Sequence, residues 1–209
     1  MSDPVHPAYE FITDEPDYRH LEDRERYRAL YEEVGTVPAN QIVRWREEWM
    51  KYFRPTPGSS ILELGAHNGP NLLHYGERGH VVDGVEISRN LITTFQRHVE
   101  RQPTDVQARV QMIEEWIEEF APDRTYDYVL CTEILEHVPD PVAVLRVAWG
   151  ALSSAGTVYI SSPATHWGNN THVRGVPLDD LERWLAEADL VKVTALVEND
   201  RTFCLARAR

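Results

Sequence analysis

The chain has 209 residues and a formal net charge of −13, from 21 Lys and Arg against 34 Asp and Glu. This length fits one domain with some additions, and the 42% of hydrophobic residues can build a core, which argues against global disorder. No apolar run approaches the roughly 18 residues of a membrane span, and residues 1–15 show no signal peptide. The acid excess argues against tight binding of naked nucleic acid.

Cys131 and Cys204 lie in apolar stretches, so we expect two buried thiols in a reducing, cytoplasmic compartment rather than a disulfide framework. The first 33 residues hold ten Asp or Glu and four Arg. Helical patterns follow over residues 19–33 and 38–53. The second has an apolar stripe typical of core packing.

From residue 60 the pattern alternates between strand and helix. Strands are predicted at 60–64, 81–85, 106–113, 126–131, 156–161, 191–197 and 202–208. Helices are predicted from residue 70, over 88–101 with Ser88 as N-cap, over 133–152 and over 178–188. This order predicts a doubly wound, mostly parallel α/β sheet whose last strand is antiparallel because it closes a hairpin. Ligands of such sheets bind at the carboxyl ends of the strands.

The first predicted strand ends in an acid and a glycine-containing turn, Glu63 to Gly69. Gly65 permits a tight turn and the close approach of a ligand to the backbone. Glu86 ends the next strand 21 residues after Gly65, where an acid can accept hydrogen bonds from two ribose hydroxyls. The alternative is that Glu86 only caps the helix at Ser88. Glu114 or Glu115, with Trp116, ends the third strand and could lie against an adenine ring, or simply begin a solvated helix.

These motifs, together with residues 127–141, resemble those of the class I S-adenosylmethionine-dependent methyltransferases. The resemblance covers residues 61–208 and implies the seven-stranded, Rossmann-like fold of that family. It implies that residues 56–209 form the S-adenosylmethionine-binding domain, and we expect residues 1–55 to form an N-terminal helical cover. The implied cofactor-binding residues are Glu63, Gly65, Ala66, His67, Gly69, Glu86, Ile87, Glu114, Glu115, Trp116, Thr132 and Glu133. His67 departs from the pattern, because the family commonly has glycine there.

Glu133, Glu136 and His137 have the spacing i, i+3, i+4, which on a helix places all three on one face. Two carboxylates and an imidazole can form half of a shell for a divalent cation such as Mg²⁺. Small-RNA 2′-O-methyltransferases are similar in this motif, and the resemblance implies Glu133, Glu136, His137 and His172 as metal ligands. Alternatively, the motif only shapes the wall of the site, as in family members without a metal.

The resemblance to ubiquinone-biosynthesis O-methyltransferases favours methylation of a small-molecule acceptor, at a hydroxyl. His137, His166 and His172 are the candidate catalytic bases, since a hydroxyl is a poor nucleophile until it loses its proton. Two alternatives remain open. One is an RNA 2′-O-methyltransferase, and the other is a non-catalytic, methyltransferase-like binding subunit. The sequence determines neither the acceptor nor the oligomeric state.

Overall fold

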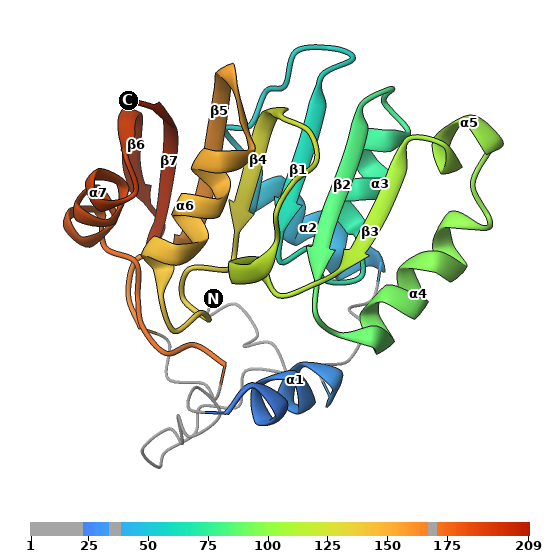
Figure 1. Cartoon of the computed structure of the whole chain (residues 1–209), viewed down its shortest axis with the longest axis horizontal. Helices are drawn as coiled ribbons and strands as arrows, with labels where there is room; N and C mark the ends of the chain where they lie inside the picture. The colour runs from blue at the N-terminus through green and yellow to red at the C-terminus, as the bar shows by residue number, and fades with distance from the viewer. Residues whose placement is uncertain (1–22, 34–38, 167–170) are drawn as a thin grey trace, which may run out of the picture.

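The computed structural model describes residues 23–33, 39–166 and 171–209. Within this part of the chain the strands are β1 (Ser60–Leu64), β2 (Val81–Glu86), β3 (Val110–Glu114), β4 (Tyr126–Thr132), β5 (Leu152–Pro163), β6 (Leu190–Glu198) and β7 (Arg201–Ala208). They form one sheet in the order β3-β2-β1-β4-β5-β7-β6 (Figure 1). Strands β1 to β5 pair in parallel, whereas β7 is antiparallel to both β5 and β6. The predicted doubly wound sheet with an antiparallel last strand is confirmed.

The helices between the strands begin at residues that favour a helix start. Ser88 caps one by accepting a hydrogen bond from Leu91 N, and Asp140 caps another by accepting from Val142 N and Ala143 N. The helices are α1 (Arg24–Glu33), α2 (Ala39–Trp49), α3 (Pro70–Gly76), α4 (Arg89–Val99), α5 (Thr104–Gln107), α6 (Pro141–Ala151) and α7 (Leu178–Glu187).

The third strand begins later than predicted, because the segment before it is helical. Residues 104–107 form the short helix α5, in which Val106 is buried, and β3 starts only at Val110. The predicted strand over residues 106–113 was therefore wrong in its first half. Its carboxyl end, which matters for the site, lies one residue further along the chain than expected.

The central strands are buried on both faces, as expected for a sheet covered by two layers of helices. Neighbouring residues of a strand point to opposite faces, so Ile61 and Leu130 belong to one hydrophobic cluster while Leu62 and Val129 belong to the other. The first cluster includes Phe53, Tyr75 and Phe95, which come from before β1 and from α3 and α4. The second includes buried residues of α6, which lies in front of the sheet in Figure 1, and of α7, which lies beside β6 at the left edge of that view.

Both cysteines are buried and free, as predicted. Among the described residues, no helix combines the length and the apolar character needed to cross a bilayer.

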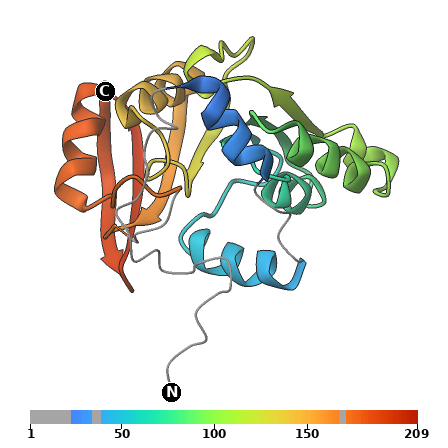
Figure 2. The same cartoon turned by 90° about the horizontal axis from the view of Figure 1, so that it is seen from below.

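Helix α1 lies outside the two covering layers, below the carboxyl edge of the sheet (Figure 1), and crosses that edge in the view from below (Figure 2). The Glu32 carboxylate accepts hydrogen bonds from Arg89 N at 2.7 Å and Asn90 N at 3.0 Å, so it satisfies amides at the start of α4. The Tyr27 hydroxyl donates to the His137 carbonyl at 3.3 Å. Helix α1 is thus attached to loops that follow different strands.

Candidate functional site

The turn after β1 requires glycine at two positions. Gly65 and Gly69 have φ angles of 74° and 73°, in the left-handed region that favours glycine. A Cβ atom at Gly65 would also lie 2.6 Å from Ile134 Cδ1. The amides of Gly65 and Ala66 both donate to the Val85 carbonyl at 3.0 Å, which ties the turn to β2. The turn predicted from these glycines is therefore present at the carboxyl edge.

His67 occupies the position where glycine is usual, and it also has a positive φ of 51°. Its Nδ1 lies 2.7 Å from Asn68 Oδ1, and its backbone amide donates to Glu86 Oε2 at 2.9 Å. A non-glycine residue in this conformation carries some strain. The bond to Glu86 helps to hold the turn in place despite that strain.

Glu63 is a buried carboxylate beside this turn. Its Oε1 accepts hydrogen bonds from Asn71 Nδ2 at 2.6 Å and from Thr132 Oγ1 at 3.0 Å. Its Oε2 is buried without a hydrogen-bond partner. Burial raises the pKa of Glu63 to about 7, although both hydrogen bonds oppose the rise. The Oε2 atom is therefore an acceptor ready for a donor from a ligand.

Glu86, at the end of β2, is a second buried carboxylate. Its Oε1 accepts from the amides of Ile87 at 2.8 Å and Ser88 at 2.9 Å, while its Oε2 accepts from His67. Burial nevertheless raises its pKa above the ordinary value. The Glu86 carboxylate thus joins the turn after β1 to the start of α4. It does more than cap the helix, because it also accepts a hydrogen bond from that turn.

The residues at the end of β3 differ in how they face the site. Glu114 is exposed and pairs with Arg89 at 2.7 Å and Arg28 at 3.6 Å. Glu115 Oε1 accepts from the amide of Trp116 at 3.1 Å. The half-buried Trp116 ring lies 5.7 Å from the Tyr27 ring of α1. Glu115 and Trp116 therefore remain candidates for a contact with adenine, whereas Glu114 is engaged at the surface.

The segment after β4 is not the helix that the spacing of Glu133, Glu136 and His137 suggested. Helix α6 begins only at Pro141, and Glu133 has a left-handed φ of 52°. The intervening backbone carbonyls accept hydrogen bonds from elsewhere, for example Glu136 O from Val173 N at 2.8 Å. The prediction that these three side chains share one helix face was wrong.

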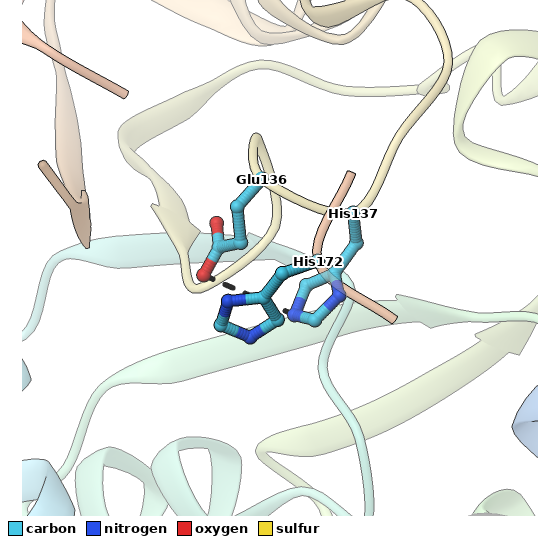
Figure 3. A group of neighbouring side chains, drawn as sticks. All are labelled: Glu136, His137 and His172. Carbon is cyan, nitrogen blue, oxygen red and sulfur yellow. Dashed lines mark ion pairs between the residues drawn. The ribbon is translucent and has the colours of Figure 1, made fainter. Parts of the chain in front are cut away.

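Glu136, His137 and His172 nevertheless come together, and Figure 3 shows their side chains pointing toward one another. Each offers one ligand atom, and these atoms lie within 4.8 Å of one another. Glu136 is fully buried, and its Oε1 has no hydrogen-bond partner and lies 3.8 Å from His137 Nε2. We call these three residues the Glu-His-His group. Glu133, the fourth predicted metal ligand, is not part of it.

A backbone carbonyl orients one of the two imidazoles of this group. His137 Nδ1 donates to Thr171 O at 2.8 Å, which leaves Nε2 as the atom directed at Glu136. Burial and the neighbouring His137 lower the pKa of His172 to about 3, so His172 is neutral near pH 7. His166 is exposed, and its Nε2 lies 2.7 Å from His172 O, so it stands at the margin of the group.

Several residues of the site escaped the sequence analysis. Asn71 donates to Glu63 from the first turn of α3, and its position after Pro70 gave the only hint. Arg201, which falls between the last two predicted strands, begins β7 and donates to Glu133 Oε1. Arg201 and Glu133 are 68 residues apart and belong to no local motif, whereas Asn71 lies only eight residues after Glu63.

A family model for a methyltransferase domain matches residues 39–195, which is well over half of the chain. Curated relatives include the ubiquinone biosynthesis O-methyltransferase of Pseudomonas entomophila (strain L48), which is 30% identical over 125 residues, covering 60% of this chain and 53% of that protein. The enzyme of that name from Albidiferax ferrireducens is 30% identical over 127 residues, covering 60% and 49%. The chain thus spans about half the length of these relatives.

Solved structures with the same fold include the glycopeptide N-methyltransferase MtfA in complex with S-adenosyl-L-methionine. It has a TM-score of 0.66 and 15% identity, and the match covers 79% of this chain and 93% of MtfA. The CcbJ methyltransferase from Streptomyces caelestis gives a TM-score of 0.63 at 14% identity, covering 87% and 95%. These likenesses show the fold, and the family model shows the membership. The chain therefore belongs to the class I S-adenosylmethionine-dependent methyltransferases.

Proposed function

We propose that this chain transfers a methyl group from S-adenosylmethionine to a hydroxyl of a small molecule. The observation that carries the proposal is the pair of buried carboxylates, Glu63 and Glu86, at the carboxyl ends of adjacent strands. The glycine turn that both flank is held to β2 by hydrogen bonds. The choice of a hydroxyl rests on the names of the O-methyltransferase relatives.

The residues present fit this cofactor. Glu63 Oε2 is a buried acceptor without a partner, and a positively charged ammonium group satisfies such an atom. We therefore assign Glu63, with Gly65, Ala66, His67, Gly69 and Thr132, to the methionine part of the cofactor. Glu86 and Ile87 are assigned to the ribose, and Glu115 and Trp116 to the adenine. When bound, the cofactor supplies a methyl group activated by a sulfonium leaving group.

The Glu-His-His group lies on the segments that follow β4 and β5, and we assign it to the acceptor hydroxyl. His137 and His172 could accept the hydroxyl proton, since the Thr171 carbonyl orients His137 and His172 is neutral. The group also fits a divalent cation, because its buried Glu136 Oε1 lacks a partner and faces an imidazole nitrogen. Such a cation, when bound, would lower the pKa of the acceptor hydroxyl. His166 is a weaker candidate because it is exposed.

We further propose that residues 1–55 cover the cofactor and that the protein works in the cytoplasm. The contacts of α1 with the loops at the carboxyl edge support the cover, although residues 1–22 and 34–38 lie outside the described part. The two buried free thiols are compatible with a reducing compartment. The net charge of −13 favours a small-molecule acceptor over RNA.

Isothermal titration with S-adenosylhomocysteine, followed by transfer of a labelled methyl group to a panel of hydroxylated small molecules, tests this proposal. Glu86→Ala is expected to abolish binding, while Glu187→Ala, an exposed residue of α7, retains it. Binding without transfer to any acceptor would favour the non-catalytic subunit. Filter binding of RNA at two salt concentrations decides against the RNA alternative if no salt-dependent complex forms. Absence of S-adenosylhomocysteine binding would refute the proposal as a whole.

A further inference from the structure

Arg201 is a buried cation that forms an ion pair with Glu133, one of the four predicted metal ligands. It is 3% exposed, the lowest exposure of any Lys or Arg side chain among the described residues. Its Nη1 donates to Glu133 Oε1, and its guanidinium lies 5.7 Å from the centre of the Trp49 ring. Among the described residues, the other carboxylate near the guanidinium is that of Glu48, whose Oε1 lies 3.9 Å from Arg201 Nε. Arg201 Nε itself has no hydrogen-bond partner. Glu133 is therefore the main counter-charge of Arg201.

The position of Arg201 follows from the sheet and not from a flexible loop. Arg201 begins β7, where it is paired with Pro163 at the end of β5 and with Glu198 at the end of β6. Glu133 follows directly on β4, and its amide donates to Ser161 O of β5 at 2.8 Å. Both ends of the ion pair are thus fixed by backbone hydrogen bonds of neighbouring strands. The contact is built into the carboxyl edge of the sheet.

This ion pair separates Glu133 from the Glu-His-His group. The group's ligand atoms gather within 4.8 Å of one another without a Glu133 oxygen among them. Yet Glu133 and Glu136 contact neighbouring residues of β5, since the Glu133 amide donates to Ser161 O at 2.8 Å and the Ser162 hydroxyl donates to Glu136 Oε2 at 3.0 Å. Without Arg201, the Glu133 carboxylate would be buried with no direct cationic partner, which favours its pairing with a cation held by the group.

We infer that Arg201 is a positioning residue that withholds Glu133 from the Glu-His-His group and so sets which cations the group prefers. The inference rests on the cation-binding part of the proposed function. One carboxylate and two imidazoles suit Mn²⁺, Fe²⁺, Co²⁺ or Zn²⁺, whereas Mg²⁺ and Ca²⁺ prefer oxygen ligands. The group with Glu133 withheld is therefore selective for transition-metal ions, and release of Glu133 adds the oxygen ligand that Mg²⁺ needs.

The test is the affinity of the full chain for Co²⁺ and for Mg²⁺, measured by isothermal titration in the absence of cofactor. We expect the wild type to bind Co²⁺ more tightly than Mg²⁺, and Glu136→Gln to abolish Co²⁺ binding. Glu133→Gln should lower both affinities by a similar factor, because Arg201 loses its counter-charge, and should leave the visible absorption spectrum of bound Co²⁺ unchanged. Arg201→Met is expected to raise Mg²⁺ affinity about 10-fold, the scale of outer-shell changes at metal sites. Arg201→Met should raise the affinity for Co²⁺ less than the affinity for Mg²⁺, so the preference of the site for Co²⁺ over Mg²⁺ becomes smaller. The visible absorption spectrum of bound Co²⁺ should change as Glu133 joins the ion.

The double variant Arg201→Met with Glu133→Gln is the matched control, because it restores the net charge and removes the carboxylate. It should lose the gain in Mg²⁺ affinity. An equal rise for both ions in Arg201→Met, which mere loss of a positive charge would produce, overturns the inference.

Where Arg201→Met fails to fold, Glu133→Gln decides alone, since a change in the visible absorption spectrum of bound Co²⁺, beyond a fall in affinity, shows that Glu133 is already a ligand and overturns the inference. No binding of either ion by any variant also overturns the inference. Titration of the same preparations with S-adenosylhomocysteine separates that outcome from failure of the proposed transferase function.

Discussion

Replacing Glu63 by glutamine tests two effects of the buried carboxylate: it destabilises the fold when it is charged, and we propose that it binds the cofactor. The pKa of Glu63 is raised from 4.5 to about 7 in the folded protein, because the folded state disfavours the charged form. The unfolded chain therefore releases this proton first as the pH rises. The wild type loses stability between about pH 4.5 and pH 7 through this group, and the loss then levels off. The pKa difference corresponds to about 3 kcal/mol.

In Glu63→Gln the side-chain oxygen can still accept from Asn71 and Thr132, while the charge is absent at every pH. The buried amide of glutamine adds a stability offset that does not depend on pH. The free energy of unfolding of the variant, minus that of the wild type, should therefore rise by about 3 kcal/mol from pH 4.5 to pH 8. Affinity for S-adenosylhomocysteine should fall, because its ammonium group loses a charged partner.

Urea denaturation of both proteins at several pH values, without cofactor, measures this difference. Other titrating groups cancel because they are common to the two proteins. Asp83→Asn is a useful contrast, since Asp83 is paired with Arg124 at 2.6 Å and its loss should destabilise the protein. A difference between Glu63→Gln and the wild type that stays flat from pH 4.5 to pH 8 would refute the reasoning.

Three further substitutions test the described geometry. Gly65→Ala should destabilise the protein by about 1–3 kcal/mol, because its φ is 74° and the new Cβ meets Ile134, and thermal denaturation will detect this. Glu86→Gln turns an amide donor toward a backbone amide, so we expect a stability loss of about 1–3 kcal/mol and at least about 10-fold weaker S-adenosylhomocysteine binding by titration. Glu32→Ala removes the acceptor for two amides of α4 and should cost about 1 kcal/mol in urea denaturation; an unchanged midpoint would show that water replaces the carboxylate.

Local signals in the sequence were sufficient for the alternation of strands and helices and for the glycine turn, although not for the start of β3. Strand alternation, the glycines and the acids near the ends of β1 and β2 act within a few residues, and parallel pairing then brings Glu63 and Glu86 to one edge. The start of α6 was also encoded locally. Pro139 and Pro141 disfavour helical conformation in the residues before them, so the helix cannot extend back to Glu133.

The electrostatics of the site could not be predicted in the same way. Arg201 and Glu133 are 68 residues apart, and only the insertion of β7 beside β5 brings them together. A spacing of i, i+3, i+4 suggested that Glu133 belonged with Glu136 and His137. The tertiary ion pair with Arg201 instead holds it apart. Such a pairing leaves no periodic trace in the sequence.

Helix α1 also links the loops at the carboxyl edge of the sheet. It contacts the loops after β2, β3 and β4, through Glu32, through Tyr27 on Trp116 and through the Tyr27 hydroxyl on His137. Their amides should therefore exchange with deuterated water as one cooperative unit whose opening energy is that of detaching α1. Contacts with a single helix would in this way give the three loops one shared free energy of local unfolding.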